Sequence, residues 1–141
     1  MAPLEERPSM AEVKAPAPRP LSPHLQIYRW SWTMAMSVAH RITAVALYGG
    51  IALFAIWLVA LASGPDAFET VQELFGSPLG ILVLFGYTGI LIHHLLGGVR
   101  HLVWDFGHGM EPQVRTNMAR FTLIGSVTLT LLIWIAAFAL R

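Results

Sequence analysis

Three long apolar stretches alternate with shorter polar segments along the chain. The apolar stretches cover approximately residues 37–62, 79–103 and 121–140. Each contains about the 20 residues that an α-helix needs to cross roughly 30 Å of hydrocarbon. The pattern therefore predicts an all-α membrane protein with three transmembrane helices.

The polar segments indicate how the rest of the chain is organised. Residues 1–23 are rich in Pro and Ala, carry mixed charge and show no apolar period, which predicts a mobile tail. Residues 24–36 combine apolar, aromatic and basic side chains, which suits a segment lying along the cytoplasmic surface and equally suits a plain connecting loop. Residues 37–141 then form one membrane domain.

The distribution of charge predicts the orientation of the spans. The link between the first two spans holds Asp66, Glu69 and Glu73 and no Lys or Arg, whereas Arg115 and Arg120 follow the second span. Basic residues also precede the first span, so the positive-inside rule places the N-terminus and the second link in the cytoplasm or matrix. The acidic residues near the N-terminus argue against a mitochondrial transit peptide, so we expect a bacterial inner membrane rather than a mitochondrial one.

Composition narrows the chemistry that the chain can perform. Charged residues make up 12% of the sequence, against about 25% in a typical soluble domain. Because the sequence has no cysteine, thiolate-bound iron–sulfur clusters and thiol chemistry are excluded within this chain. A metal would have to be held by histidine or carboxylate. The formal net charge of +1 indicates no particular partner, and we expect no nucleic acid.

The second span carries ionisable side chains inside its apolar stretch. His94, Gly97, Gly98, His101 and Asp105 follow the spacing i, i+3, i+4, i+7 and i+11, so they share one helix face. A neutral imidazole in mid-span is a good iron ligand, and a glycine notch lets a flat ligand or another backbone come close. Ionisable groups inside a span indicate a functional site by default. This face suits a b-type haem.

The start of the first span carries a second set of polar residues. His40 and Arg41 are adjacent there, and Arg100 and His101 lie at the same end of the antiparallel second span. Both His–Arg pairs are thus predicted on one side of the membrane, where they would pair with haem propionates. His94 alone lies at a convincing depth for iron, so a second axial ligand would come from another chain. The pattern predicts a hetero-oligomeric cytochrome.

Plainer interpretations account for the same residues. His93 is about 100° away from the ligand face and would donate to a carbonyl or pack against another helix. Arg41 and Arg100 would extend to lipid headgroups, and the two glycines would serve close helix packing. The chain would then be a haem-free structural anchor or a helix-bundle adaptor. The absorption spectrum of the protein with its partners separates the two interpretations.

Three segments together resemble the cytochrome b subunits of succinate dehydrogenase, which are membrane anchors of respiratory complex II. They are RPLSPHLQIY at residues 19–28, SVAHRIT at 37–43 and HLLGGVRHLVWDFG at 94–107. The resemblance extends from residue 19 to the C-terminus and includes the three-span layout. Two departures are Ala44, where the family commonly has glycine, and Trp30, where proline is frequent.

The resemblance implies roles for individual residues. His94 corresponds to the axial ligand of haem b, and His40, Arg41 and His101 to the group around the haem propionates. Ser37 and Arg41 correspond to residues of the ubiquinone site. Asp105 completes the motif, either to orient Arg100 or His101 or as a solvated interfacial acid.

The resemblance also implies partners. A second small membrane anchor subunit would supply the other haem ligand, and electrons would arrive from an iron–sulfur subunit. Succinate oxidation would occur on a flavoprotein subunit, so this chain would hold no catalytic residue for that step. The same fold also serves quinol:fumarate reductases, and the sequence does not distinguish the two directions.

Overall fold

The computed structural model describes residues 28–140, which form four helices: α1 (Trp32–Ser63), α2 (Pro65–Gly76), α3 (Pro78–Asp105) and α4 (Pro112–Ala139). α1, α3 and α4 are long and apolar enough to cross a membrane. The predicted all-α fold with three candidate membrane spans is confirmed. The predicted tail at residues 1–23, the first part of the segment 24–36, and residue 141 lie outside the described residues.

Proline and glycine set the boundaries between the helices. Pro65, Pro78 and Pro112 each open a helix, where the missing N–H would have had no partner within the helix. Gly64 joins α1 to α2 with φ of 117°, a backbone conformation that glycine adopts at little cost. These residues divide the chain into helices joined by very short connections.

α1 begins at Trp32, earlier than the predicted span. The Ser31 hydroxyl accepts a hydrogen bond from the Met34 N–H at 3.3 Å and caps the helix. Residues 32–36, which the sequence interpretation assigned to an interfacial segment, therefore belong to α1. About two turns of helix precede His40, so this residue lies further into the helix than its position in the predicted span suggests.

The predicted acidic link between the first two spans contains the 12-residue helix α2. Phe68, Val71 and Phe75 follow the spacing i, i+3 and i+7 and are half-buried, whereas Glu69 and Glu73 are exposed. The sequence interpretation relied on the acidic side chains of this segment and overlooked the helical period of its apolar ones.

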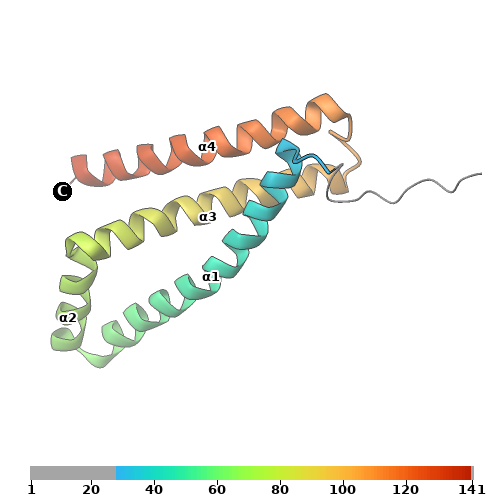
Figure 1. Cartoon of the computed structure of the whole chain (residues 1–141). Helices are drawn as coiled ribbons and strands as arrows, with labels where there is room; N and C mark the ends of the chain where they lie inside the picture. Colours follow the sequence, from blue (N-terminus) through green and yellow to red (C-terminus); the bar gives the residue numbers. More distant parts are fainter. Residues whose placement is uncertain (1–27, 141) are drawn as a thin grey trace, which may run out of the picture.

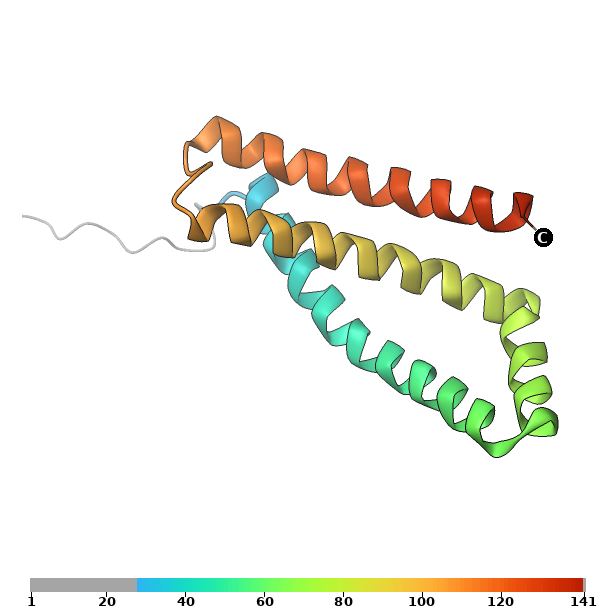
Figure 2. The ribbon, with the colours of Figure 1, turned by 180° about the vertical axis from the view of Figure 1, so that it is seen from behind.

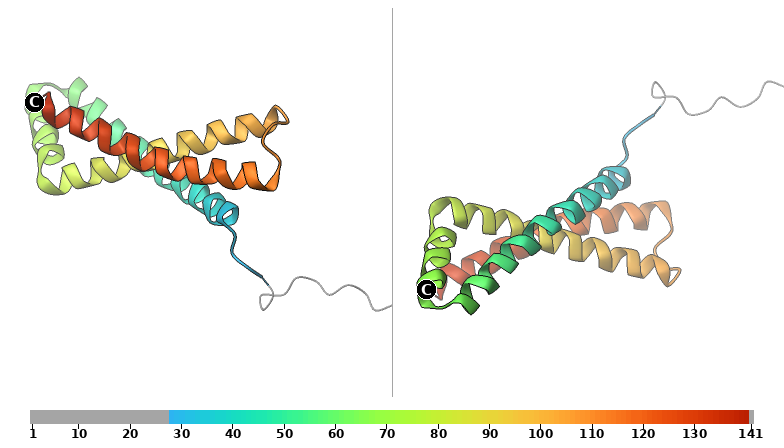
Figure 3. Two further views of the ribbon diagram at one scale, coloured as in Figure 1. Left: turned by 90° about the horizontal axis from the view of Figure 1, so that it is seen from above. Right: turned by 90° about the horizontal axis from the view of Figure 1, so that it is seen from below.

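The three long helices do not form a parallel-sided bundle. α3 and α4 run side by side along most of their length (Figure 1). α1 lies against both near its N-terminal half and then diverges toward α2, which returns the chain to the start of α3 (Figure 2). Seen from above and from below, α1 crosses the α3–α4 pair at an angle (Figure 3). The crossing region brings together side chains from all three long helices.

The interior of the bundle is more polar than its surface. Large apolar side chains cover the outside of the three long helices, as expected for a protein surrounded by lipid. The interface between α3 and α4 buries small and polar side chains instead. Its small and polar side chains that are at most 8% exposed are His93, Arg100, Ala119, Thr122, Ser126 and Thr130. Small side chains let two helices approach closely, and hydroxyls can hydrogen-bond within the membrane.

Candidate functional site

Three imidazoles meet where α1 crosses α3, and we call His40, His94 and His101 the histidine cluster. The rings of His40 and His94 are stacked, with centroids 4.1 Å apart and planes inclined by 4°. The His101 ring lies 5.1 Å from that of His40, at 37°. The sequence interpretation placed His40 near the interface and His94 in mid-span, whereas the structure places the two rings at one level. The predicted convergence of His40 and His101 is confirmed.

The two adjacent glycines of α3 have different surroundings. A Cβ atom added at Gly97 would overlap the imidazole of His40, so this glycine makes room for that ring. A Cβ added at Gly98 would meet nothing within 4 Å. The sequence interpretation assigned both glycines to the approach of a porphyrin. In the structure His40 occupies the space beside Gly97, and the space beside Gly98 remains open.

Hydrogen bonds determine which ring nitrogen of His94 carries a proton. The Thr43 hydroxyl donates to the carbonyl of His40 at 2.8 Å, so its oxygen is left to accept. Nδ1 of His94 lies 3.2 Å from the Thr43 oxygen and 3.2 Å from the His40 carbonyl oxygen. Because both neighbours are acceptors, the Nδ1 atom carries the proton, and the Nε2 atom keeps its lone pair.

The hydrogen-bond partners of His94 suit a histidine that binds iron. A metal-binding histidine usually donates its other ring N–H to a carbonyl or similar acceptor, which fixes the tautomer and raises the basicity of the ligating nitrogen. His94 meets this requirement through Thr43 and the His40 carbonyl. The side chain is half-buried, and Gly98 one turn further on leaves space beside the same face. The histidine cluster thus fits a haem held from α3.

Ser37 and Arg41 lie on α1 next to the histidine cluster. They are four residues apart and therefore occupy neighbouring positions on one face of the helix. Ser37 is half-buried and Arg41 is exposed. Within residues 28–140 neither side chain forms a hydrogen bond or ion pair, so both are available to a ligand or a partner.

Arg100 lies at the same end of α3 as His101, as predicted, but its side chain is buried against α4 instead of being exposed at the rim. It is 4% exposed and faces α4, and its guanidinium carbon is 5.2 Å from the ring centroid of Trp104. One residue turns a helix by about 100°, so His101 faces His40 while Arg100 faces α4. Asp105 is exposed and forms no ion pair with either residue in the described part of the chain.

His93 is buried between α3 and α4 at 8% exposure. Its Nδ1 atom lies 3.3 Å from the Ser126 hydroxyl oxygen, and that hydroxyl donates to the Leu123 carbonyl at 2.8 Å. The Ser126 oxygen therefore accepts, and the Nδ1 atom of His93 carries the proton. Its Nε2 atom is buried and has no partner among residues 28–140.

The sequence interpretation missed the two hydroxyls that fix these tautomers. Thr43 lies three residues after His40, and this spacing was the available signal for a role beside the cluster. Ser126 gave no comparable signal, because its partner lies on another helix. Both residues became recognisable once the helices were placed side by side.

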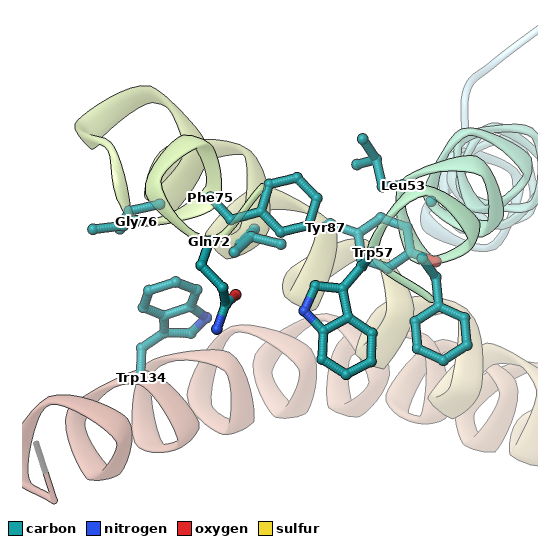
Figure 4. Close-up of a pocket in the computed structure, with 11 residues that line it drawn as sticks. Leu53, Trp57, Gln72, Phe75, Gly76, Tyr87 and Trp134 are labelled. Atoms are coloured by element: carbon teal, nitrogen blue, oxygen red, sulfur yellow. The ribbon is translucent and has the colours of Figure 1, made fainter. Parts of the chain in front are cut away.

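A recess lies at the end of the bundle opposite the histidine cluster, where α1 diverges from α3 and α4. It has a volume of about 470 Å³ and is lined by aromatic side chains of α1, α2, α3 and α4. Figure 4 shows the indoles of Trp57 and Trp134 on either side of the Gln72 side chain. None of the predicted site residues lines this recess. It is therefore separate from the histidine cluster.

Comparison with known proteins decides the family. Residues 15–133 match the model of the succinate dehydrogenase/fumarate reductase transmembrane subunit. The chain belongs to this family. It is a transmembrane subunit, in agreement with its three apolar helices.

Individual relatives give the same result. The chain is 42% identical over 120 residues to the succinate dehydrogenase cytochrome b556 subunit of Paracoccus denitrificans, covering 85% of this chain and 92% of the relative. It is 41% identical to the mitochondrial cytochrome b560 subunit of Sus scrofa, covering 77% of this chain and 66% of the relative. The cytochrome b556 subunit of Rickettsia felis is 30% identical over 118 residues. The resemblance found in the sequence motifs is confirmed.

Proposed function

We propose that the chain is the membrane-anchor cytochrome b subunit of a succinate:quinone oxidoreductase. It binds haem b through His94 together with a second small anchor subunit, and it forms part of the ubiquinone-reduction site. The observation that carries the proposal is the environment of His94. Thr43 and the His40 carbonyl hold its Nδ1 proton, which leaves the Nε2 lone pair for iron.

The remaining members of the histidine cluster serve the periphery of the haem. The haem, when bound, supplies one-electron redox chemistry. His40 and His101 lie beside His94 and offer ring N–H donors for propionate oxygens, with Arg41 as the adjacent cation. Gly98 keeps one face of α3 free of side-chain atoms. The fourth helix contains no histidine, which supports an axial ligand from the second anchor subunit.

Ser37 and Arg41 contribute to the quinone site. Arg41 stabilises negative charge that develops on a quinone oxygen as it is reduced, and Ser37 donates a hydrogen bond or positions a water molecule. Electrons reach this site from an iron–sulfur subunit, and succinate is oxidised on a flavoprotein subunit. The exposed or half-buried state of the two side chains, each without a partner within residues 28–140, supports this role.

The proposed orientation places the N-terminus in the cytoplasm of a bacterial inner membrane. The histidine cluster lies toward the start of α1 and the end of α3, and Arg115 and Arg120 lie near the start of α4 at the same end. The acidic helix α2 lies at the opposite end. This segregation of basic and acidic residues supports the positive-inside orientation.

The haem assignment is tested by substituting two histidines to alanine in the assembled complex. We expect His94→Ala to remove or rearrange the haem, as seen in the dithionite-reduced absorption spectrum. The matched control is His108→Ala, at an exposed position in the loop before α4, which should leave the spectrum unchanged. An unaltered spectrum in the His94 variant would refute this ligand. A complex without any haem would favour the plain structural anchor.

A further inference from the structure

Arg100 is a cation enclosed between α3 and α4 without an anion beside it. Its side chain is 4% exposed, and no hydrogen bond or ion pair joins it to any of residues 28–140. Its guanidinium carbon lies 5.2 Å from the centroid of the Trp104 ring, which offers a π face but no negative charge. Burying an unpaired charge is costly, above all in a membrane, so Arg100 calls for an anion from outside the described chain.

The titratable groups near Arg100 do not balance its charge. His93 lies seven residues earlier on the same face of α3, and His40 approaches from α1, so both lie within range of the positive charge. An imidazole is neutral or positive, and no hydrogen bond joins either ring to Arg100 in the described part of the chain. Asp105, the one acid of α3, is exposed and forms no ion pair within residues 28–140. The missing anion is therefore not among the described residues.

A groove of about 200 Å³ opens at this residue between α3 and α4, and we call it the Arg100 groove. Val99 and Phe121, which are 51% and 72% exposed, belong to its apolar walls. The Nε atom of Arg100 is enclosed, whereas its two terminal nitrogens retain accessible surface and have no partner within residues 28–140. The Thr122 hydroxyl donates to the Met118 carbonyl at 2.9 Å. Among the residues that line the groove, Arg100 alone therefore offers free donors to a ligand.

The depth of the groove matches the level at which lipid headgroups begin. α3 has 28 residues and is therefore about 42 Å long, against roughly 30 Å of hydrocarbon, so a centred helix extends about 6 Å beyond it at each end. Arg100 precedes the end of α3 by five residues, or about 7.5 Å, which places it near that boundary. The headgroups of one leaflet lie just outside the boundary. Basic pockets between transmembrane helices at this level bind lipid headgroups.

We propose that the Arg100 groove binds a membrane phospholipid through its phosphodiester. The guanidinium donates to two phosphate oxygens, in the paired geometry that arginine and phosphate share. An acyl chain lies along the apolar walls toward the middle of the membrane. The phosphodiester is a permanent anion, so it balances the charge that no described group balances. The groove faces α4, away from the histidine cluster, so the proposal does not depend on whether haem binds there.

The test is photolabelling of the assembled complex with a phosphatidylglycerol that carries a diazirine in one acyl chain, followed by mass spectrometry of the labelled peptides. We expect label on groove-lining residues of α3 and α4. Unlabelled phosphatidylglycerol should suppress it, whereas a diacylglycerol with the same chains should compete roughly tenfold less well, because it lacks the phosphate. Inorganic phosphate should not compete, because it lacks the chains.

Three results would overturn the proposal. Equal competition by the diacylglycerol would show that the phosphate is not recognised. Competition by inorganic phosphate would assign the groove to a soluble anion. A groove without label would assign Arg100 to a carboxylate of a partner subunit.

Variants of the arginine identify the recognising group. Arg100→Gln should lower labelling roughly tenfold and abolish the preference for phosphatidylglycerol over the diacylglycerol. Arg100→Lys should retain part of the preference, because the ammonium keeps the charge but not the paired donors. Arg115→Gln, at an exposed arginine of α4 outside the groove, is the matched control and should be labelled normally. An unchanged preference in Arg100→Gln would contradict the proposal.

A second pair of variants decides the question if the Arg100 variants fail to assemble. Val99→Trp places a large side chain in the wall of the groove and leaves Arg100 intact, so the label should be lost. Leu82→Trp is its control, at a 64% exposed position near the opposite end of α3, and should be labelled normally. Normal labelling of the Val99→Trp complex would show that the lipid does not occupy the groove.

Discussion

His93 and His94 are neighbours in the sequence, and their Nδ1 atoms have the same pattern of hydrogen bonds. In each case a hydroxyl from an adjacent helix gives its proton to a backbone carbonyl and then accepts from the Nδ1 atom of the imidazole. Both rings are thereby left with a lone pair on the Nε2 atom. The difference is the surroundings: His94 is half-buried beside two other imidazoles, whereas His93 is enclosed between α3 and α4.

This comparison shows that the tautomer of a histidine does not by itself assign its role. A rotation of about 100° between successive residues is enough to place two equivalent nitrogen atoms in unrelated environments. The face of His94 also carries Gly98 and His101, which suit a large planar cofactor. The face of His93 carries hydroxyl-bearing residues of α4 and borders an apolar cavity.

The largest expected effect separates the two histidines directly. His94→Ala should abolish the haem absorption band of the complex, because it removes the axial nitrogen. His93→Ala should retain the band, although it leaves the Ser126 oxygen without its donor. The measurement is the reduced-minus-oxidised spectrum, normalised to total protein. Loss of the band in both variants would show that the two faces do not act separately.

The next largest effect is expected at the two α1 residues next to the histidine cluster. Arg41→Ala and Ser37→Ala should each lower quinone reduction while the haem spectrum is retained. For Arg41 we expect a loss of about 10- to 100-fold, the range for a hydrogen bond to a charged group. Succinate-dependent reduction of a soluble ubiquinone analogue measures it, with Arg115→Ala as the control at an exposed arginine of α4. Full turnover in the Arg41 variant would remove this residue from the quinone site.

A smaller effect should come from the hydroxyls that hold the rings. Thr43→Val keeps the shape of the side chain but removes one acceptor from the Nδ1 proton of His94. We expect haem retention to weaken by up to about tenfold, in the range known for groups that orient metal ligands. The midpoint potential should rise, because a less basic imidazole stabilises ferric iron less. Ser126→Ala removes the acceptor of the His93 Nδ1 proton instead. It should leave the midpoint potential of the haem unchanged in a redox titration.

The smallest effects are expected at the paired glycines. Gly97→Ala places a Cβ against the His40 ring and should destabilise the complex by about 1–3 kcal/mol, as overpacking does. Gly98→Ala meets open space within this chain and should be neutral or stabilising by up to about 1 kcal/mol when haem is absent, because alanine favours helix. Thermal unfolding of the two variants measures the difference. Equal melting temperatures would mean that the crossing of α1 and α3 tolerates a side chain at Gly97.

Much of the architecture followed from the sequence because periodicity and length report it directly. The apolar stretches predicted three membrane helices, and helical spacing predicted that His94 and His101 share a face with Gly98. The burial of Arg100 against α4 could not be predicted, because the sequence does not show which neighbouring helix each face of α3 contacts. Helix α2 was missed because its acidic residues outweighed the spacing of Phe68 and Phe75. The roles of Thr43 and Ser126 required the pairing of helices, which no local pattern contains.

The divergence of α1 from the α3–α4 pair has a mechanical consequence. α1 has 32 residues and is therefore about 48 Å long, well above the roughly 30 Å of the hydrocarbon layer. Bilayers of different thickness are accommodated by tilting such a helix. The helices then move least where α1 crosses α3, which is at the stacked rings of His40 and His94. Changes in lipid would displace the recess around Gln72 and leave the imidazole pair aligned.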